Sequence, residues 1–237
     1  MEKEIVVYTA ISGDYDELRT PSVINKNADY VCYTDNSRIK SDFWEIREFP
    51  KNNLDSVRKA RNVKIRPHLY LEGYKFSIWI DGNLDIIGDI DTLMNNFQKQ
   101  KYKLMTFKHP ERNCIYKEAE RCIYFQNEDP FIINKQIEAY TEDGLPKEVG
   151  MVETNVLLRE HNDERVIESM EKWWLEVEKY SRRDQLSFNY VFWKYQYEYG
   201  LLMGDSRGNS SFFERREHKT SIAKKIKRKI KRVFHQY

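Results

Sequence analysis

Short apolar runs and longer amphipathic stretches alternate along the chain and predict an α/β fold. Runs rich in β-branched and aromatic residues predict strands at residues 5–11, 30–34, 43–49, 76–80, 103–107 and 152–158. Helix-forming residues in amphipathic spacing predict helices at residues 55–66, 114–125, 131–142, 163–180 and 184–196. Because strands and helices alternate, we expect a single domain with a mostly parallel sheet flanked by helices.

A polar turn follows the most apolar of these strands. The run at 76–80 ends at Asp81-Gly82-Asn83. In extended geometry, side chains at positions i and i+2 project to the same side, so Asp81 and Asn83 could hold one cation, with Asp85 as a further ligand. Mg²⁺ and Mn²⁺ prefer oxygen ligands and keep positions open for diphosphate oxygens. An ordinary Asp-Gly turn is the alternative interpretation.

A row of basic residues occupies the predicted helix just before that strand. Arg58, Arg61 and Lys64 fall within an arc of roughly 120° at 100° per residue. Guanidinium groups are natural partners of phosphate oxygens, so the row is a candidate diphosphate-binding surface. A solvated helix face is the alternative.

Other titratable residues lie in loops or at helix ends. His109 follows the predicted strand at 103–107, and its alternatives are a binding role and a structural one. Glu118 and Glu153 are further candidates, with buried pairing to arginine as the alternative. Asp184 begins a predicted helix, where it either accepts hydrogen bonds from substrate hydroxyls or complements the helix dipole.

Composition and charge separate a globular body from a basic end. The 237 residues are 40% hydrophobic and 14% aromatic, which argues against the disordered and low-complexity classes. Eight of the 40 basic residues, and none of the 38 acidic ones, lie at 219–237, which leaves 32 basic against 38 acidic elsewhere. Because residues 204–211 are polar and glycine-rich, we expect a compact domain at 1–211 and a tail at 212–237.

The cysteines and the amino-terminal segment favour a reducing, cytoplasmic location. Cys32, Cys114 and Cys122 show no C-x-x-C spacing, which argues against a zinc knuckle and a disulfide framework. The seven-residue apolar run near the amino terminus is too short for the core of a signal sequence. No stretch approaches the ~20 apolar residues of a membrane span.

The basic tail has the pattern of an amphipathic helix. Apolar residues of 222–237 fall within roughly 120° of a helical wheel, while seven Lys/Arg at 224–232 occupy the remainder. Each such charge contributes about 1 kcal/mol near an anionic leaflet, so we expect peripheral attachment to the inner membrane face. A helix that binds a partner protein is the alternative. The acidic body shows no nucleic-acid motif, so we expect no nucleic-acid partner.

An ordered series of short motifs resembles one known family. The motifs are Val7-Tyr8-Thr9-Ala10 with Gly13-Asp14-Tyr15-Asp16, Tyr33-Thr34-Asp35, Arg58-Lys59-Ala60-Arg61 to His68, Trp79-Ile80-Asp81-Gly82-Asn83, His109-Pro110-Glu111-Arg112, Tyr116-Lys117-Glu118-Ala119 and Arg183-Asp184-Gln185-Leu186-Ser187-Phe188. Over residues 4–195 the chain resembles a glycosyltransferase-like family once catalogued as domain of unknown function 616. That family includes plant mucilage and pectin enzymes and bacterial members.

The resemblance implies a GT-A-like fold that binds a nucleotide sugar with Mn²⁺ or Mg²⁺. The nucleotide-sugar residues that it implies are Thr9, Ala10, Tyr15, Asp35, Arg58, Arg61, Lys64, Gly82, His109, Arg112, Glu118 and Arg183. The implied metal ligands are Asp81, Asn83 and His218, and the implied catalytic residues are Asp184, Gln185 and Glu153. Asn83 stands where many GT-A enzymes have a second aspartate, which weakens charge neutralisation of the metal.

The expected function is transfer of a sugar from a nucleotide-sugar donor to a hydroxyl group. We expect a uridine-linked donor and an acceptor that is a surface glycan or its lipid-linked precursor. Two alternatives stay open. A nucleotidyltransferase would also use a cation and basic groups but would attack phosphorus, and a non-catalytic membrane-bound module would keep only a degenerate form of the fold.

Overall fold

A computed structural model of the protein describes residues 3–217, and a seven-stranded sheet forms its centre. The strands lie in the order β3 (Glu45–Glu48), β2 (Ala28–Thr34), β1 (Ile5–Ile11), β4 (Phe76–Ile80), β7 (Val152–Arg159), β6 (Leu104–Lys108) and β8 (Gly200–Leu202). The neighbouring strands pair in parallel except β7, which is antiparallel to both β4 and β6. The predicted α/β fold with a mostly parallel sheet is therefore confirmed.

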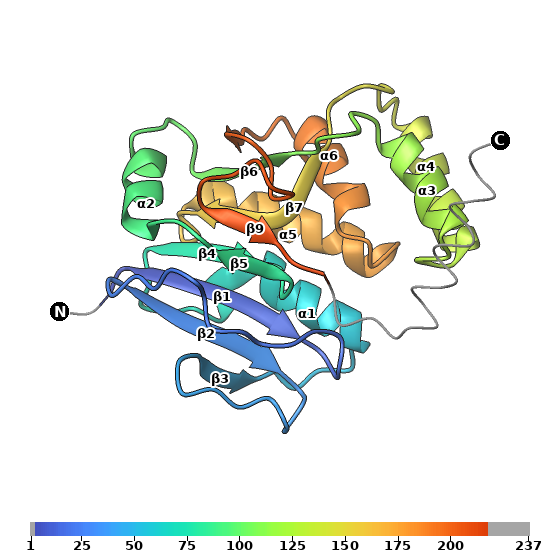
Figure 1. The fold of residues 1–237 in the computed structure, drawn as a ribbon. Helices are drawn as coiled ribbons and strands as arrows, with labels where there is room; N and C mark the ends of the chain where they lie inside the picture. The colour runs from blue at the N-terminus through green and yellow to red at the C-terminus, as the bar shows by residue number, and fades with distance from the viewer. Residues whose placement is uncertain (1–2, 218–237) are drawn as a thin grey trace.

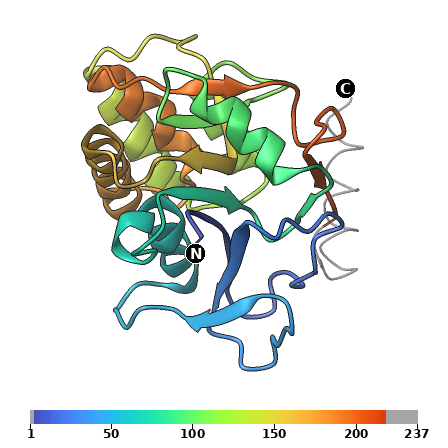
Figure 2. The ribbon, with the colours of Figure 1, turned by 90° about the vertical axis from the view of Figure 1, so that its left-hand side faces the viewer.

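Helices cover both faces of this sheet (Figures 1 and 2). One face carries α1 (Ser56–Ile65), α3 (Ile115–Tyr124), α4 (Pro130–Glu142), α5 (Glu164–Lys179) and α6 (Gln185–Lys194). The other carries α2 (Ile90–Gln98) and the two-stranded ribbon of β5 (Leu84–Ile86) and β9 (Phe213–Arg215). A short 3₁₀ helix, Pro67–Leu69, follows α1.

Alternation along the strands divides the core into two layers. On β1, Val6 and Tyr8 pack into the cluster below α1 and α5, whereas Ile5 and Val7 pack toward α2. Successive side chains of a strand point to opposite faces, so a strand covered on both sides is apolar almost throughout. This explains why β1 and β4 appear in the sequence as continuous hydrophobic runs.

Aspartates fix where four of the helices begin. The side chain at each N-cap accepts a hydrogen bond from a backbone N–H of the first turn, at Asp55 for α1, Asp89 for α2, Asp129 for α4 and Asp163 for α5. Such caps satisfy donors that have no partner within the helix. The Asp55 cap fixes the residue at which α1 begins, and this determines which α1 side chains face the candidate site.

Strand direction brings several loops to one edge of the sheet. The chain leaves β1 toward β2 on one side and later returns to β4 on the other, so the strand order reverses between β1 and β4. Because β7 is antiparallel to both β4 and β6, β6 runs in the direction of β4. The carboxyl ends of β1, β2, β4, β6 and β8 therefore meet the amino end of β7.

The compact body extends beyond the predicted boundary at residue 211. Strand β9 pairs with β5, Phe213 is fully buried, and the Arg216 N–H donates to the Asn83 carbonyl at 2.8 Å. Residues 204–211, expected to end the body, are packed against it, since Ser206 is also fully buried. The boundary prediction was wrong because β9 is held by pairing with β5, which lies far away in the sequence, and local composition does not reveal such pairing. The rest of the predicted tail, residues 218–237, lies outside the described residues.

Candidate active site

The candidate site lies where the strand order reverses, at the carboxyl ends of β1 and β4. In open α/β sheets, ligands bind in the crevice outside such a reversal. Asp81 directly follows β4, and its backbone N–H donates to the Asn155 carbonyl of β7 at 2.9 Å. Its side chain is 29% exposed, so a carboxylate faces this edge of the sheet.

Four elements bring their charged and polar side chains together just behind Asp81. The Lys64 Nζ lies 2.6 Å from Asp184 Oδ2, 3.1 Å from Thr154 Oγ1 and 3.6 Å from Asp81 Oδ1. The Arg61 Nε forms an ion pair with Asp184 Oδ1 at 2.9 Å. We call Arg61, Lys64, Asp81 and Asp184 the ion cluster. It joins α1, β4 and the amino end of α6.

Burial and charge oppose each other within the ion cluster. Burial raises the pKa of Asp184, but the positive charges of Arg61 and Lys64 outweigh it and hold that pKa well below its usual range. Burial lowers the pKa of Lys64, and the charges of Asp184 and Asp81 oppose that shift. We conclude that Asp184 is ionised at neutral pH and already has cationic partners, so it is no free base.

Two aromatic residues hold Lys64 and Asp81 in place. The Tyr8 hydroxyl donates to the Lys64 carbonyl at 2.8 Å, which satisfies an acceptor in the last turn of α1. The Trp79 Nε1 donates to Asp81 Oδ1 at 2.9 Å, and the Lys64 Nζ lies 5.6 Å from the centroid of the same ring. Both rings are buried, so the geometry of the ion cluster is fixed before any ligand binds.

The predicted Asp81–Asn83 pair is wrong in its geometry. Residues 81–84 form a turn, with the Leu84 N–H donating to the Asp81 carbonyl at 2.9 Å, and not the extended backbone that the prediction assumed. Asn83 is buried, and its Nδ2 donates to the Arg216 carbonyl at 3.1 Å. Its amide is therefore used to hold the chain after β9, a contact that the local sequence does not reveal.

The donor set available to a divalent cation is correspondingly small. Within residues 3–217, no group of three or more histidine, cysteine or acidic side chains could hold a metal ion. His218, the third predicted ligand, lies outside the described residues. Mg²⁺ is commonly held by only one or two carboxylates together with substrate phosphates. Asp81, which is partly exposed at this edge, fits such a cation together with a diphosphate.

The predicted basic row divides into two parts. Arg58 donates from Nε to the Val177 carbonyl at 3.1 Å and forms an ion pair with Asp55 at 2.7 Å. It therefore ties α1 to the end of α5, and the prediction that it faces a diphosphate is not supported. Lys64 is fully buried, so it contacts ligands only through Asp81 and Asp184. Arg61 is the member of the row that is both partly exposed and in the ion cluster.

The loops after β1 and β2 lie on the β1 side of the candidate site. Asp35 accepts hydrogen bonds from the Gly13 N–H at 2.7 Å and the Ser12 hydroxyl at 3.1 Å, so it shapes the loop that carries Tyr15. Tyr15 itself is 63% exposed. Thr9 is buried and Ala10 half-buried, which leaves this exposed loop as the surface that a base could contact.

Gly82 allows the loop after β1 to approach β4 closely. A Cβ at this position would lie 3.2 Å from Ile11 Cγ1 and 3.5 Å from the Asp16 side chain. Such contacts would force the neighbours apart by a few tenths of an ångström. The glycine therefore serves close packing of the two strand ends.

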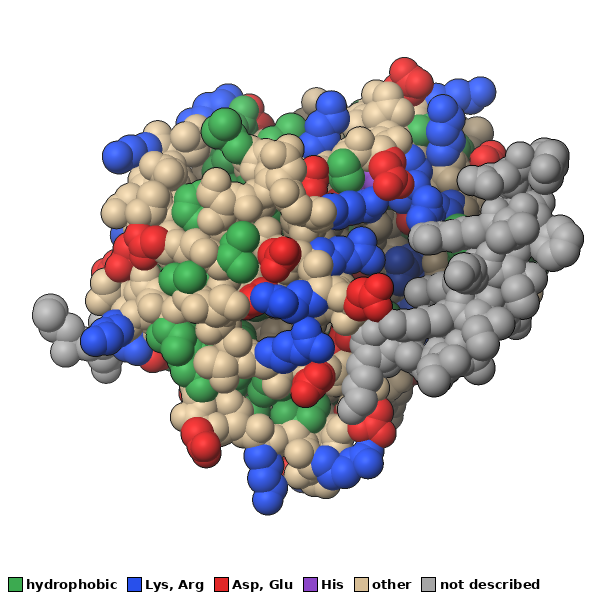
Figure 3. Space-filling view, viewed as in Figure 1, with side chains coloured by type: hydrophobic (Ala, Val, Ile, Leu, Met, Phe, Trp, Pro, Cys, Tyr) green, Lys and Arg blue, Asp and Glu red, His purple; other side chains and the backbone are tan. Residues whose placement is uncertain are grey.

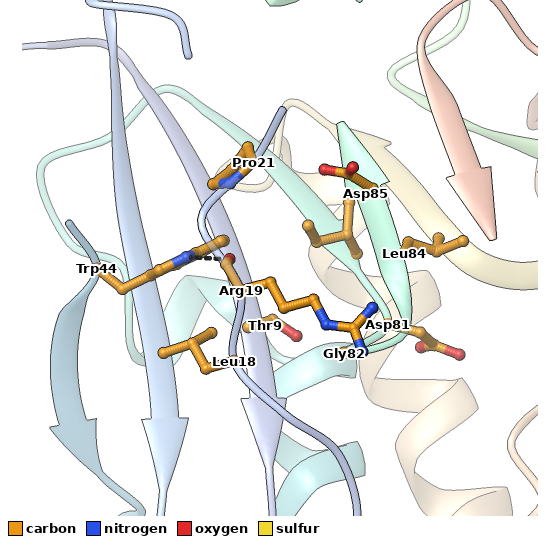
Figure 4. Close-up of a pocket in the computed structure, with 10 residues that line it drawn as sticks. Thr9, Leu18, Arg19, Pro21, Trp44, Asp81, Gly82, Leu84 and Asp85 are labelled. Atoms are coloured by element: carbon orange, nitrogen blue, oxygen red, sulfur yellow. Dashed lines mark hydrogen bonds between the residues drawn. The ribbon is translucent and has the colours of Figure 1, made fainter. Parts of the chain in front are cut away.

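Arg19 is a candidate phosphate ligand that the sequence did not single out. Its side chain reaches over Gly82 toward Asp81 (Figure 4), and its carbonyl accepts a hydrogen bond from Trp44 Nε1 at 2.8 Å. It lines a cavity of about 20 Å³, which has room for a water molecule but not for a sugar. No local motif marks Arg19, because the fold of the loop after β1 brings it to the cavity that Asp81 also lines.

A second charged group lies at the carboxyl end of β6. His109 is buried, and its Nδ1 accepts from the backbone N–H groups of Glu111 and Arg112 at 3.1 and 3.0 Å. The Arg112 Nε forms an ion pair with Glu118 at 2.6 Å. Burial, together with the charges of Arg112 and Arg207, lowers the pKa of His109 to about 4, so the ring is neutral at pH 7.

Glu153 is paired with an arginine, which confirms the structural alternative to a catalytic role that the sequence left open. The Arg207 Nε donates to Glu153 Oε1 at 2.8 Å, and the Ser206 hydroxyl donates to Oε2 at 3.3 Å. Both partners come from residues 204–211, the polar stretch expected to end the compact domain. A tight turn holds this segment together, with the Asp205 N–H donating to the Asn209 carbonyl at 3.2 Å and Gly204 at a φ of +76°.

The remaining predicted residues lie around the start of α6. The Gln185 Nε2 donates to the Val152 carbonyl at 2.8 Å, which ties α6 to β7. Burial lowers the pKa of Arg183, but contacts with Cys122 and Asp184 outweigh this effect and raise the pKa overall. Arg183 is thus a fixed cation between α3 and the ion cluster.

Comparisons with known proteins agree on a glycosyltransferase-like domain. The TOD1/MUCI70 glycosyltransferase-like domain matches residues 35–223. Among curated proteins of Arabidopsis thaliana, a probable hexosyltransferase, MUCI70, is 26% identical over 216 residues, which cover 79% of this chain and 37% of that protein. An alkaline ceramidase, TOD1, is 26% identical over 226 residues, which cover 81% of this chain and 49% of that protein. The chain thus spans less than half the length of these relatives.

Two solved glycosyltransferase structures are also similar to this chain. The apo structure of the bifunctional glycosyltransferase WbbM superimposes with a TM-score of 0.48 at 11% identity, covering 85% of this chain and 39% of that chain. The apo form of mouse xyloside xylosyltransferase 1 gives a TM-score of 0.46 at 11% identity, with 84% of each chain covered.

Proposed function

We propose that this chain, which belongs to the TOD1/MUCI70 family of glycosyltransferase-like domains, transfers a sugar from a nucleotide-sugar donor to an acceptor hydroxyl. The observation that carries this proposal is the convergence of Asp81, Arg61, Lys64 and Asp184 where the strand order reverses. Such a crevice suits a nucleotide, and a fixed arrangement of charges suits a reaction whose leaving group becomes more negative. A uridine diphosphate sugar is the proposed donor.

In this proposal Asp81 would hold a divalent cation against the diphosphate. Arg61, beside Asp184, and Arg19, which lines a cavity together with Asp81, would contact the phosphate oxygens. A bound Mg²⁺ or Mn²⁺ would supply positive charge to the diphosphate oxygens as the bond from sugar to phosphate breaks. Lys64 holds the carboxylates of Asp81 and Asp184 in position. Because Asp184 is buried, ionised and paired, its role is to hold Arg61 and Lys64 in position and not to remove a proton.

The experiment that tests the proposal is product analysis with a panel of nucleotide sugars. Incubation of the purified chain with Mn²⁺, a uridine diphosphate sugar and candidate glycan acceptors is expected to release uridine diphosphate, detected by chromatography. Release of pyrophosphate from a nucleoside triphosphate and a sugar phosphate would identify a nucleotidyltransferase instead. Fatty acid release from ceramide would point to the activity named for the TOD1 relative. Failure to bind any nucleotide sugar, with or without Mn²⁺, would favour a non-catalytic module.

The proposed acceptor is a surface glycan or a lipid-linked precursor at the cytoplasmic face of the membrane. The basic tail motivates this location, because eight Lys/Arg at 219–237 follow an acidic body. None of the helices between residues 3 and 217 has the length and hydrophobicity needed to cross a bilayer.

Deleting residues 219–237 is expected to release the protein from anionic vesicles. Attraction of about 1 kcal/mol for each basic residue near the surface would be lost with the segment, while the sheet and the ion cluster are untouched. Flotation with vesicles containing phosphatidylglycerol measures binding, and neutral phosphatidylcholine vesicles are the control. Equal flotation of the full and shortened chains would contradict membrane attachment through the tail.

A further inference from the structure

Three arginines from separate segments surround one exposed carboxylate at the carboxyl end of β6. Glu111 Oε1 lies 2.7 Å from Arg207 Nη1, and Glu111 Oε2 lies 3.2 Å from Arg112 Nη1 and 3.8 Å from Arg121 Nη1. Arg112 belongs to the loop after β6, Arg121 to α3 and Arg207 to the segment between β8 and β9. We call these three residues the arginine triad. The side chain of Glu111 is 53% exposed, so this carboxylate lies at the surface.

The arginines of the triad have more hydrogen-bond donors than their carboxylate partners use. Arg112 pairs also with Glu118, and Arg207 pairs also with Glu153. Arg121, which is 42% exposed, has Glu111 at 3.8 Å as its one ion-pair partner among the residues that the structure describes. A guanidinium carries five donors, and a carboxylate or phosphate can accept two of them at once. Arg121 therefore keeps most of its donors for another anion.

The surroundings keep the positive charges of the triad close together. The Arg121 guanidinium stacks over the Phe125 ring, at 5.3 Å from its centroid, which limits its movement away from the group. His109, which contacts Arg112, is neutral at pH 7 and adds no further positive charge. Burial and the nearby charge of Arg112 lower the pKa of Arg121, which is the effect expected when cations crowd together.

The triad lies beside the ion cluster along the same sheet edge. The His109 N–H donates to the Met151 carbonyl at 2.8 Å, and Phe107 of β6 pairs with Glu153 of β7. The next residue of β7, Thr154, accepts a hydrogen bond from Lys64 in the ion cluster. Basic side chains gather on one face of the molecule (Figure 3). The two groups therefore contact neighbouring residues of β7.

We propose that Arg112, Arg121 and Arg207 form an anion subsite for the acceptor, which binds a phosphate or carboxylate group that the acceptor carries. This inference rests on the proposed transferase function, since it assigns the acceptor to the β6 side and the nucleotide to the β1 side of the edge. Glu111 occupies the subsite in the free protein. It moves aside when the acceptor's anion takes its place, and the exposure of its side chain leaves room for that movement.

The test uses the whole chain with uridine diphosphate at saturation, so that the donor's own phosphate site is filled. Inorganic phosphate and glucuronate are then titrated separately by calorimetry. Arg121→Gln is expected to weaken binding of the preferred anion about tenfold, which is the effect of losing one charge-assisted contact. Glu111→Gln is expected to strengthen it by about fivefold or more, because a competing carboxylate is removed.

Lys135→Gln is the matched control, because it removes one exposed positive charge from α4 without touching the triad. It is expected to leave both affinities unchanged. Preference for phosphate would support a lipid phosphate or phosphorylated glycan as acceptor, and preference for glucuronate would support an acidic sugar.

Anion binding that is absent, or that is equal in all three variants, would overturn the subsite. If the unaltered protein does not bind uridine diphosphate, the result would contradict the proposed function itself. The two failures are thereby distinguishable.

Discussion

Asp184→Asn is expected to lower the free energy of unfolding by about 3–5 kcal/mol, the cost of breaking a buried ion pair by removing one partner. The amide would leave the Lys64 ammonium, fully buried at 2.6 Å from the present carboxylate, without its strongest counter-charge. It would also remove the ion pair with Arg61 at 2.9 Å. Asp81, 3.6 Å from the same ammonium, compensates only in part.

Thermal unfolding measures this effect directly. For a domain of this size, such a loss corresponds to a decrease in Tm of about 10 °C. Asp42→Asn makes the same chemical change at an exposed position of the loop before β3, and it is expected to shift Tm by about 1 °C or less. Equal Tm values for the two variants would show that the ion cluster contributes nothing to stability.

The dependence of stability on pH provides a second measurement for the same variant. The folded-state pKa of Asp184 lies below its ordinary value of 3.8. The carboxylate therefore stabilises the fold above that value, and this contribution is lost as pH falls through the folded-state pKa. In Asp184→Asn the stability should decrease less steeply below pH 3.8 than in the unaltered protein. Parallel acid unfolding curves would contradict the assignment.

The buried strands are the part of the fold that the sequence predicts best. Strand β1 and strand β4 have the predicted bounds, because strands covered on both faces are continuous apolar runs closed by polar turns. The predicted helices likewise agree within a few residues, since aspartate caps mark several of their starts.

Strands that form only by pairing with a segment far away in the sequence cannot be predicted from local sequence patterns. Strands β5 and β9 are each three residues long, and each is a strand because it pairs with the other across most of the chain. The same long-range pairing turns Asn83 toward Arg216 and brings residues 204–211 onto β7. The polar, glycine-rich composition of 204–211 predicts a flexible segment. Composition alone does not show that this segment packs against β7.

For the candidate site, the sequence predicts the residue types but not their partners. Arg58 and Arg61 share one arc of α1, yet Arg58 contacts the end of α5 while Arg61 contacts Asp184. The helical wheel gives the direction of a side chain, and only the packing of α1 against α5 decides what it meets. Arg207, which neutralises Glu153, carries no local signal at all.

The ion cluster and the arginine triad are suited to different roles along this edge of the sheet. In the ion cluster two cations pair with two carboxylates, and Lys64 and Asp184 are buried, so these charges are fixed. In the triad three cations pair with three carboxylates, but Arg121 and Glu111 are exposed, so the Arg121 guanidinium is available to a ligand. Fixed charges suit the reacting centre, and available charges suit a substrate that must enter and leave.

Asp81→Asn is expected to lower the rate of sugar transfer by on the order of 10²- to 10³-fold, the usual effect of removing one preorganised electrostatic contact. The amide oxygen can still accept the hydrogen bond from Trp79 Nε1, and Lys64 keeps Asp184 as its partner, so the fold should persist. What is lost is the negative charge that would hold a divalent cation against the diphosphate. Enhancement of donor binding by Mn²⁺ should therefore disappear too, as measured by thermal shift with a uridine diphosphate sugar.

Asp85→Asn is the matched control, because the same substitution is made beside the same turn at a carboxylate that Ser22 and Arg216 occupy, and not at a free metal ligand as the sequence had suggested. The Asp85 carboxylate accepts hydrogen bonds from the Ser22 N–H at 2.9 Å and hydroxyl at 2.6 Å, and it also pairs with Arg216. Its loss should reduce stability while the transfer rate stays within about threefold. Full activity in Asp81→Asn, or an equal loss of rate in both variants, would remove Asp81 from the reaction. The site would then have to be sought away from the end of β4.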